Sequence, residues 1–231
     1  MKKKEVLILI GLLILSGFLE ACLLTKTSIW HDEAFSVLLP QYPVTEMIYR
    51  AGLDVHPPFY YILLKAWFFF LGNSVFSLRL FSLAFGALSV VIFFYLIKMS
   101  FGDKKLSLFL SFLFLSNCFF IQYEIEGRMY TLALFFFLTS SLFLVRALKK
   151  KKKLDYLLHS LFAVLGIYTH YYVFFLIFAQ GCFLAMHFLK KSGFSLKRLL
   201  SNRDLKAFVF SFFLIGILFL PWLKTFLAQF H

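Results

Sequence analysis

Long apolar segments, separated by short clusters of lysine and arginine, dominate this sequence. Several of the apolar segments approach or exceed about 18 residues with few charges, the length that a helix needs to cross roughly 30 Å of hydrocarbon. Over the whole chain 61% of the residues are hydrophobic and 15% are charged, which leaves too little polar surface to cover a water-soluble core. The pattern therefore predicts an all-α, multi-pass integral membrane protein.

The basic residues indicate how the chain is oriented. Of the 24 lysines and arginines, 18 lie in four short segments, residues 2–4, 98–105, 146–153 and 190–206. Such clusters beside apolar spans are typical of cytoplasmic loops, whereas a nucleic-acid-binding protein gathers its cations in one groove or patch. The net charge of +13 therefore indicates orientation and attraction to anionic lipids, and nucleic acid is not expected as a partner.

These features predict a bundle of about seven transmembrane helices in the plasma or inner membrane, with a cytoplasmic N-terminus and an outer C-terminus. The predicted spans are residues 6–24, 76–97, 106–121, 129–148, 154–169, 172–189 and 205–223. The net acidic loop 25–55 is predicted to lie outside.

A further apolar stretch, residues 57–71, is short for a span and contains Lys65. If it crossed the membrane, the next basic cluster would fall outside, so we predict an outer juxtamembrane helix. Its tyrosines and Trp67 suit the membrane–water interface.

Polar motifs occur at four helix ends that this topology places on the outer face, at residues 30–33, 54–58, 122–130 and 168–172. Ionisable groups at a membrane surface usually face a cavity or one another. A transport pathway would more often place its polar groups near the middle of the membrane. The convergence of the motifs on one face therefore predicts a functional site there.

Each motif also has a purely structural interpretation. Asp32 could cap a helix that begins at the next residue. Glu126 and Arg128 could form an ion pair across a tight turn, and His56 and His170 could be interfacial histidines that hydrogen-bond locally. The occurrence of all these residues on one predicted face favours a site over these separate explanations.

The ordered motifs resemble the family 39 and 83 glycosyltransferases of the GT-C superfold, relatives of protein O-mannosyltransferases and of the aminoarabinose transferase that acts on lipid A. The resemblance rests on residues 31–33, 56–61, 123–130 and 169–171 and extends over about residues 5–225. It implies a GT-C-like bundle that transfers a sugar, with inversion, from a polyprenyl-phosphate donor to a lipid, glycan or protein acceptor of the cell envelope.

The resemblance also implies roles for individual residues. Asp32 would be the general base that deprotonates the acceptor hydroxyl, and Glu33 would position Asp32, the acceptor or an ion. Arg128 would bind the donor phosphate, Glu126 would orient Arg128, and His56 would add a hydrogen bond or a charge. The remaining side chains expected to line the sugar and phosphate pocket are Tyr123, Tyr130, His170 and Tyr171.

Metal use varies within the superfold and stays open here. Asp32, Glu33, His56 and His170 could supply ligands to a divalent metal, but their spacing is not diagnostic.

Members of the resembled family are typically much longer than this chain. We therefore expect residues 1–231 to form one transmembrane domain that matches their N-terminal half and is truncated at the C-terminus. The alternatives to an active transferase are an inactive truncated transferase and a non-enzymatic membrane protein, either a lipid-binding scaffold or a transporter fragment.

Overall fold

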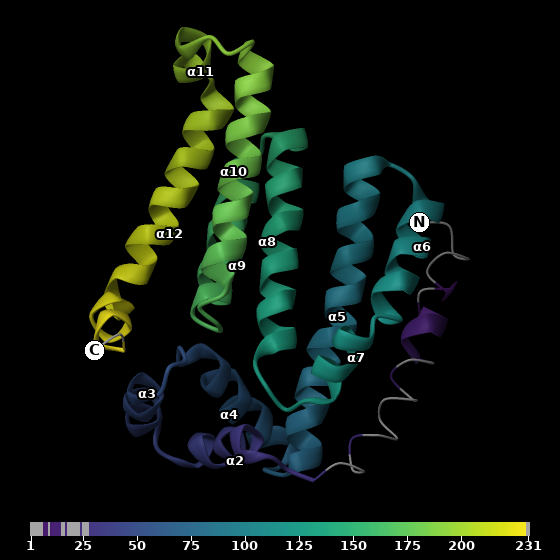
Figure 1. Cartoon of the computed structure of the whole chain (residues 1–231), viewed down its shortest axis with the longest axis vertical. Helices are drawn as coiled ribbons and strands as arrows, with labels where there is room; N and C mark the ends of the chain where they lie inside the picture. The colour runs from purple at the N-terminus through teal and green to yellow at the C-terminus, as the bar shows by residue number, and fades with distance from the viewer. Residues whose placement is uncertain (1–6, 9, 15–16, 18–23, 25–27, 230–231) are drawn as a thin grey trace.

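The computed structural model describes residues 7–8, 10–14, 17, 24 and 28–229, and the regular structure of this part of the chain is helical (Figure 1). The predicted first span, residues 6–24, lies for the most part outside the described residues. The helices from residue 31 onward are α2 (His31–Leu38), the short 3-10 helix η1 (Leu39–Gln41), α3 (Val44–Leu53), α4 (Phe59–Leu71), α5 (Val75–Phe101), α6 (Lys104–Leu115), α7 (Cys118–Ile125), α8 (Tyr130–Lys150), α9 (Lys153–Ile167), α10 (Val173–Ser192), α11 (Leu196–Ser201) and α12 (Arg203–Ala228).

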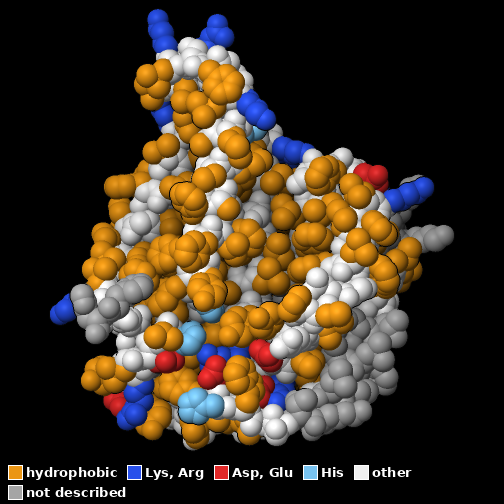
Figure 2. All heavy atoms as spheres, viewed as in Figure 1, with side chains coloured by type: hydrophobic (Ala, Val, Ile, Leu, Met, Phe, Trp, Pro, Cys, Tyr) orange, Lys and Arg blue, Asp and Glu red, His pale blue; other side chains and the backbone are white. Residues whose placement is uncertain are grey.

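The long helices form a bundle in which α8 packs against both α5 and α9, and α12 packs against α9. The short helices α2, α3 and α4 gather at one end of this bundle, and α11 lies at the opposite end (Figure 1). We call that opposite end the basic end, because it carries residues 149–153, 190–191, 197–198 and 203–206. Figure 2 shows its lysines and arginines beyond a largely hydrophobic surface.

Short polar residues set the helix boundaries at the turns. The side chain of Ser74 accepts a hydrogen bond from the Ser77 amide at the start of α5. Gly102, with a φ of 76°, ends that helix in the left-handed conformation that glycine adopts without strain. Asp103 then accepts from the amides of Lys105 and Leu106 and begins α6. This sequence produces the tight turn between α5 and α6.

The described residues contain four helices that are long and apolar enough to cross a membrane, namely α5, α8, α10 and α12. The helices α6 and α7 make a fifth candidate if they are one broken span, since they are bent by 62° at a short break. The predicted count of about seven is therefore not confirmed. The predicted span 154–169 is α9, which has 15 residues and is shorter than a typical span.

The stretch that was expected to form a juxtamembrane helix is the helix α4, but its tyrosines are buried within the protein. Tyr60 and Tyr61 are both 0% exposed and their rings contact each other at 5.1 Å between centroids. Tyr60 also packs edge-on against Phe81 of α5. The exposed aromatic residues of α4 are instead Phe69 and Phe70, near its C-terminal end. The first turn of α4 is thus part of the core beneath α2.

Lys65, which made residues 57–71 look unsuited to a span, has a structural role. Its ammonium group donates to the carbonyl oxygens of Pro40 and Tyr42, at 2.7 and 2.9 Å. These carbonyls belong to η1 and the turn after it. Lys65 therefore holds the connection between α2 and α3 against α4.

Candidate functional site

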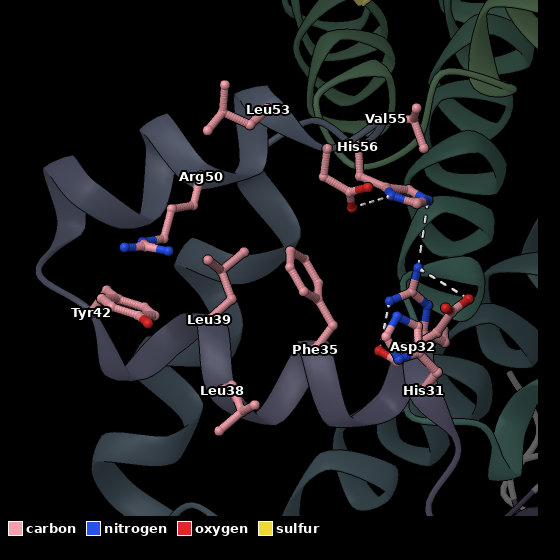
Figure 3. A pocket seen from close by; sticks show the side chains of 12 residues that line it. His31, Asp32, Phe35, Leu38, Leu39, Tyr42, Arg50, Leu53, Val55 and His56 are labelled. Carbon is pink, nitrogen blue, oxygen red and sulfur yellow. Dashed lines mark hydrogen bonds and ion pairs between the residues drawn. The ribbon is translucent and has the colours of Figure 1, made fainter.

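A cavity of about 660 Å³ opens among α2, η1, α3 and the segment before α4 (Figure 3). Polar side chains from separate parts of the chain meet at one wall, and apolar side chains of α2 and η1 separate them from Tyr42 and Arg50 at the other side (Figure 3). The lining residues are His31, Asp32, Phe35, Leu38, Leu39, Tyr42, Arg50, Leu53, Asp54, Val55, His56 and Arg128.

Asp32 presents its carboxylate to this cavity. Helix α2 begins at His31, its N-cap residue is Trp30, and no side chain caps it. The capping interpretation of Asp32 therefore does not describe the structure. The side chain is 40% exposed, and its closest ion-pair contact is 3.8 Å from the Arg128 guanidinium. A carboxylate in the first turn of a helix is stabilised by the helix dipole, and the Asp32 carboxylate is accessible from the cavity.

Arg128 is a buried cation at the wall of the cavity, with 2% of its side chain exposed. Its Nη1 donates to the Asp32 carbonyl oxygen at 2.8 Å and to the Ser36 hydroxyl at 3.1 Å. Its Nε donates to no described residue. A buried guanidinium is costly unless an anion lies close enough to neutralise its charge. The Asp32 carboxylate lies 3.8 Å from the Arg128 guanidinium, so the site favours binding of an anion.

Glu33, the neighbour of Asp32, points away from the cavity. It is 1% exposed and forms a bidentate ion pair with Arg79 of α5, at 2.8 and 2.6 Å. Its Oε1 also accepts from the Gly127 amide at 2.8 Å. Burial alone would raise the pKa of Glu33, but the hydrogen bonds from Arg79 and Gly127 and the charge of Arg79 lower it below its usual value.

These contacts clamp the loop that carries Arg128. The Tyr60 hydroxyl donates to the Gly127 carbonyl oxygen at 3.0 Å, and the Ser82 hydroxyl donates to the Arg128 carbonyl oxygen at 3.2 Å. A Cβ atom at Gly127 would lie 2.4 Å from the Leu78 side chain, so this position requires glycine. The guanidinium of Arg128 is thus positioned by a loop that is fixed from both sides.

Glu126 does not orient Arg128, contrary to the sequence-based expectation. The residue has extended backbone angles, and its carboxylate accepts from the Gln122 side chain at 3.2 Å. It lines a separate cavity of about 360 Å³ together with Glu33 and Arg79. The ion pair between Glu126 and Arg128, which was the purely structural interpretation of these residues, is not formed either.

A row of rings leads away from the cavity. His56 Nδ1 lies 2.9 Å from Asp54 Oδ2, and the His56 ring meets the His170 ring edge-on at 5.9 Å. The Tyr130 ring lies 5.7 Å from His170, and Tyr123 lies 4.7 Å from Tyr130. The structure therefore brings these predicted residues together, in one line that begins at the cavity wall.

His170 is neutral at neutral pH. Burial lowers its pKa to about 4, and electrostatic interactions with His56 and Arg128 act in the same direction. His56 Nε2 lies 3.5 Å from Arg128 Nη2. When Nδ1 donates its proton to Asp54, this Nε2 is a lone-pair acceptor and helps to orient the guanidinium.

Tyr171 does not join this group. Its hydroxyl donates to Gln229 at 2.7 Å and accepts from the Trp222 indole at 2.8 Å. Gln229 in turn donates to the carbonyl oxygens of Gly52, at 3.1 Å, and Asp54. Tyr171 thus ties the turn between α9 and α10 to the end of α12, and Gln229 ties that end to α3 and the segment before α4. Sequence reasoning missed this role for the C-terminal part of the chain.

A second, apolar cavity of about 580 Å³ lies beside the first. Val55 lines both cavities. The other lining residues of the second cavity are Tyr171, Tyr172, Phe174, Phe175, Phe226 and Gln229.

The four residues weighed as metal ligands do not form one cluster. Glu33 is committed to Arg79, and His56 is bound to Asp54. Within the part of the chain that the structure describes, no three His, Cys, Asp or Glu side chains are grouped to hold a metal ion.

Arg79 is the main residue of this region that the sequence analysis did not single out. The available signal was a lone arginine near the start of the apolar segment 76–97, because a charge inside such a segment generally has a buried partner.

Comparison with known proteins adds one finding. The profile of a protein family described as "Dolichyl-phosphate-mannose-protein mannosyltransferase" matches residues 55–223, well over half of the chain. The matched segment includes His56, Arg128 and His170, and it begins after Asp32. No curated protein and no solved structure matches the chain.

Proposed function

The chain belongs to the dolichyl-phosphate-mannose-protein mannosyltransferase family, and on this basis we propose that it transfers a sugar from a polyprenyl-phosphate donor to an acceptor hydroxyl. The observation that carries the proposal is the pairing of a buried, incompletely neutralised Arg128 with an accessible Asp32 at one cavity wall. The first group suits the donor phosphate, and the second suits the acceptor hydroxyl.

Two neighbouring cavities support the proposed position of the donor. Its phosphate binds at Arg128, where the guanidinium can offer charge-assisted hydrogen bonds. Its polyprenyl chain occupies the apolar cavity beside Tyr172 and Phe175, which shares Val55 with the polar one. Tyr172 and Phe175 are 70% and 72% exposed, so this cavity is open to a lipid chain.

The transfer follows from this placement. The acceptor oxygen attacks the anomeric carbon on the face opposite the phosphate, and Asp32 takes the hydroxyl proton as the new C–O bond forms. The bond between the anomeric carbon and the phosphate oxygen breaks, and polyprenyl phosphate leaves with the electron pair. Arg128 stabilises the charge on the departing phosphate, and His56 keeps the guanidinium in place. The configuration at the anomeric carbon is inverted.

Glu33 has a positioning role in this proposal rather than a chemical one. It fixes Arg79 and the Gly127 amide and so supports the loop that carries Arg128. Tyr123, Tyr130 and His170 form the wall along which the sugar lies, as their ring contacts suggest.

We further propose that the cavity faces the outer side of the plasma or inner membrane. The support is the distribution of charge, because the basic end lies opposite the α2–α4 end (Figure 1) and basic residues are retained in the cytoplasm.

The test is sugar transfer by the full chain in liposomes, with a labelled polyprenyl-phosphate sugar and a soluble or lipid acceptor. Replacement Arg128→Gln is expected to reduce transfer at low donor concentration about 10- to 150-fold, the range for a lost hydrogen bond to a charged group. Arg50→Gln is the matched control, because Arg50 lines the same cavity but is exposed and paired with Glu46. Thermal unfolding of each variant checks its folding.

Equal transfer by the Arg128→Gln variant and the unaltered chain would contradict the proposed phosphate site. A well-folded chain that transfers no sugar from any polyprenyl-phosphate donor would favour an inactive transferase or a non-enzymatic membrane protein.

A further inference from the structure

A groove of about 490 Å³ runs between α9 and α12 at the basic end of the bundle. It lies at the opposite end of these helices from α2–α4 and the candidate site (Figure 1). The lining residues are Lys153, Tyr156, Leu157, Ser160, Lys206, Ala207, Phe210 and Ser211.

The walls of this groove suit a hydrocarbon chain. Leu157 and Phe210 are 47% and 58% exposed, although each belongs to a helix that packs against the other. The hydroxyls of Ser160 and Ser211 lie 2.6 Å apart, and both donate to the Tyr156 carbonyl oxygen, at 3.1 and 3.2 Å. The two serine hydroxyls within the groove are therefore already satisfied, and they place no demand on a ligand.

Lys153 and Lys206 add positive charge to this apolar groove, and the nearby acids are committed elsewhere. Asp204 pairs with Lys151 at 2.8 Å and lies 4.0 Å from Lys191. Asp155 is buried and pairs with Arg146 of α8 at 3.0 Å. Among the described residues, neither Lys153 nor Lys206 has an acidic partner within the molecule. Two uncompensated cations thus border an apolar slot.

We propose that this groove binds one anionic phospholipid of the leaflet at the basic end. An acyl chain lies between α9 and α12, and the headgroup phosphate lies between Lys153 and Lys206. The distance along α9 from Lys153 to Ser160 is about 10 Å at 1.5 Å per residue, enough for the first part of an acyl chain. A peptide in the same slot would leave backbone groups without hydrogen-bond partners, and a zwitterionic lipid would add a cation beside the lysines.

The bound lipid joins the two helices that form the groove. Helix α12 carries Trp222, which donates to Tyr171 at the opposite end of the bundle. A lipid that fixes α12 against α9 therefore also supports the apolar cavity that Tyr171 lines. This inference does not depend on the proposed transferase activity, because its evidence comes from the other end of the molecule.

The test uses the full chain, purified in detergent and mixed with phosphatidylglycerol or phosphatidylcholine, with bound lipid counted by native mass spectrometry. The variant Lys153→Gln/Lys206→Gln is expected to bind phosphatidylglycerol about 25-fold more weakly, since each lysine near an anionic lipid contributes about fivefold. The matched control is Lys152→Gln/Lys197→Gln, which removes the same charge from the same end but from outside the groove. This control is expected to bind nearly as well as the unaltered chain.

A second variant, Ala207→Leu, fills the groove without changing its charge and is expected to reduce phosphatidylglycerol binding as well. A phosphatidylglycerol with a photoreactive acyl chain should label peptides of α9 and α12. Equal losses in the groove variant and the control variant would overturn the proposal in favour of a diffuse surface effect. So would equal binding of phosphatidylcholine, or labelling confined to other helices.

Discussion

Replacement of Glu33 by glutamine separates two roles that the sequence left undistinguished. The carboxylate is 1% exposed and its partner Arg79 is 2% exposed, so the substitution removes one charge from a buried pair. Glutamine has nearly the same shape and keeps one acceptor oxygen, which can still serve either Arg79 or the Gly127 amide. The loss is therefore mainly electrostatic, because Arg79 no longer has the negative charge of Glu33 beside it.

The size of the effect follows from this burial. Removing one partner of a buried ion pair costs about 3–5 kcal/mol, and the oxygen that glutamine keeps places Glu33→Gln at about 3 kcal/mol. For a chain of this length each kcal/mol lowers the melting temperature by about 2–4 °C. We expect a decrease of roughly 6–12 °C.

The assay is thermal unfolding of the purified protein in detergent, with transfer activity measured well below the transition. Glu46→Gln is the control, because Glu46 forms an exposed pair with Arg50 and its loss should cost less than about 1 kcal/mol. The double variant Glu33→Gln/Arg79→Met should be more stable than the sum of the single effects predicts, by at least about 1 kcal/mol. This coupling arises because the double variant removes both charges of the pair together.

A melting temperature equal to that of the unaltered chain, together with lost transfer, would refute this reasoning. It would assign Glu33 to the chemistry instead of to the support of the Arg128 loop.

Three further predictions concern the rest of the site. His170 has a pKa of about 4 when folded, against an ordinary value near 6.5, so the unfolded chain binds the extra proton and stability falls as the pH falls from 6.5 to 4. Between pH 7 and pH 5 we expect His170 to contribute a loss of about 1–2 kcal/mol, so the decrease seen in unfolding curves should be smaller by this amount in His170→Gln. Tyr171→Phe should destabilise the protein by about 1–2 kcal/mol, because it removes the hydrogen bonds that tie the turn between α9 and α10 to the end of α12; an unchanged melting temperature would contradict this link. In a variant without its natural cysteines, an impermeant thiol reagent should label Tyr172→Cys from outside the cell and Lys197→Cys only after permeabilisation, and the reverse pattern would overturn the orientation.

The sequence predicted much of the fold because the membrane imposes simple rules on composition. Apolar length and basic clusters identified the long helices α5, α8, α10 and α12. They did not identify α9 as a shorter buried helix, because its length depends on how it packs between α8 and α12. The break between α6 and α7 was not predicted either, because the apolar pattern continues through it.

The candidate site shows a similar division. Motifs far apart in the sequence did converge, since Asp32, His56 and Arg128 line one cavity. The directions of neighbouring side chains were harder to predict. On a helix, adjacent residues point about 100° apart, so Asp32 faces the cavity while Glu33 faces Arg79.

Glu126 illustrates the corresponding effect in extended backbone. Its φ and ψ of −82° and 131° do not continue the helix that precedes it, and its carboxylate reaches Gln122. The Glu126 carboxylate therefore does not pair with Arg128, although the two residues are close in the sequence.

The central claim is that Asp32 is the general base of sugar transfer, and the most direct test is the turnover of Asp32→Asn at saturating donor. Its carboxylate supports no other described element beyond a 3.8 Å contact, so the variant should fold and bind donor as the unaltered chain does. We predict that kcat falls by about 10²- to 10⁴-fold, the usual contribution of a general base. Turnover at the unaltered rate by a folded Asp32→Asn protein would contradict the account.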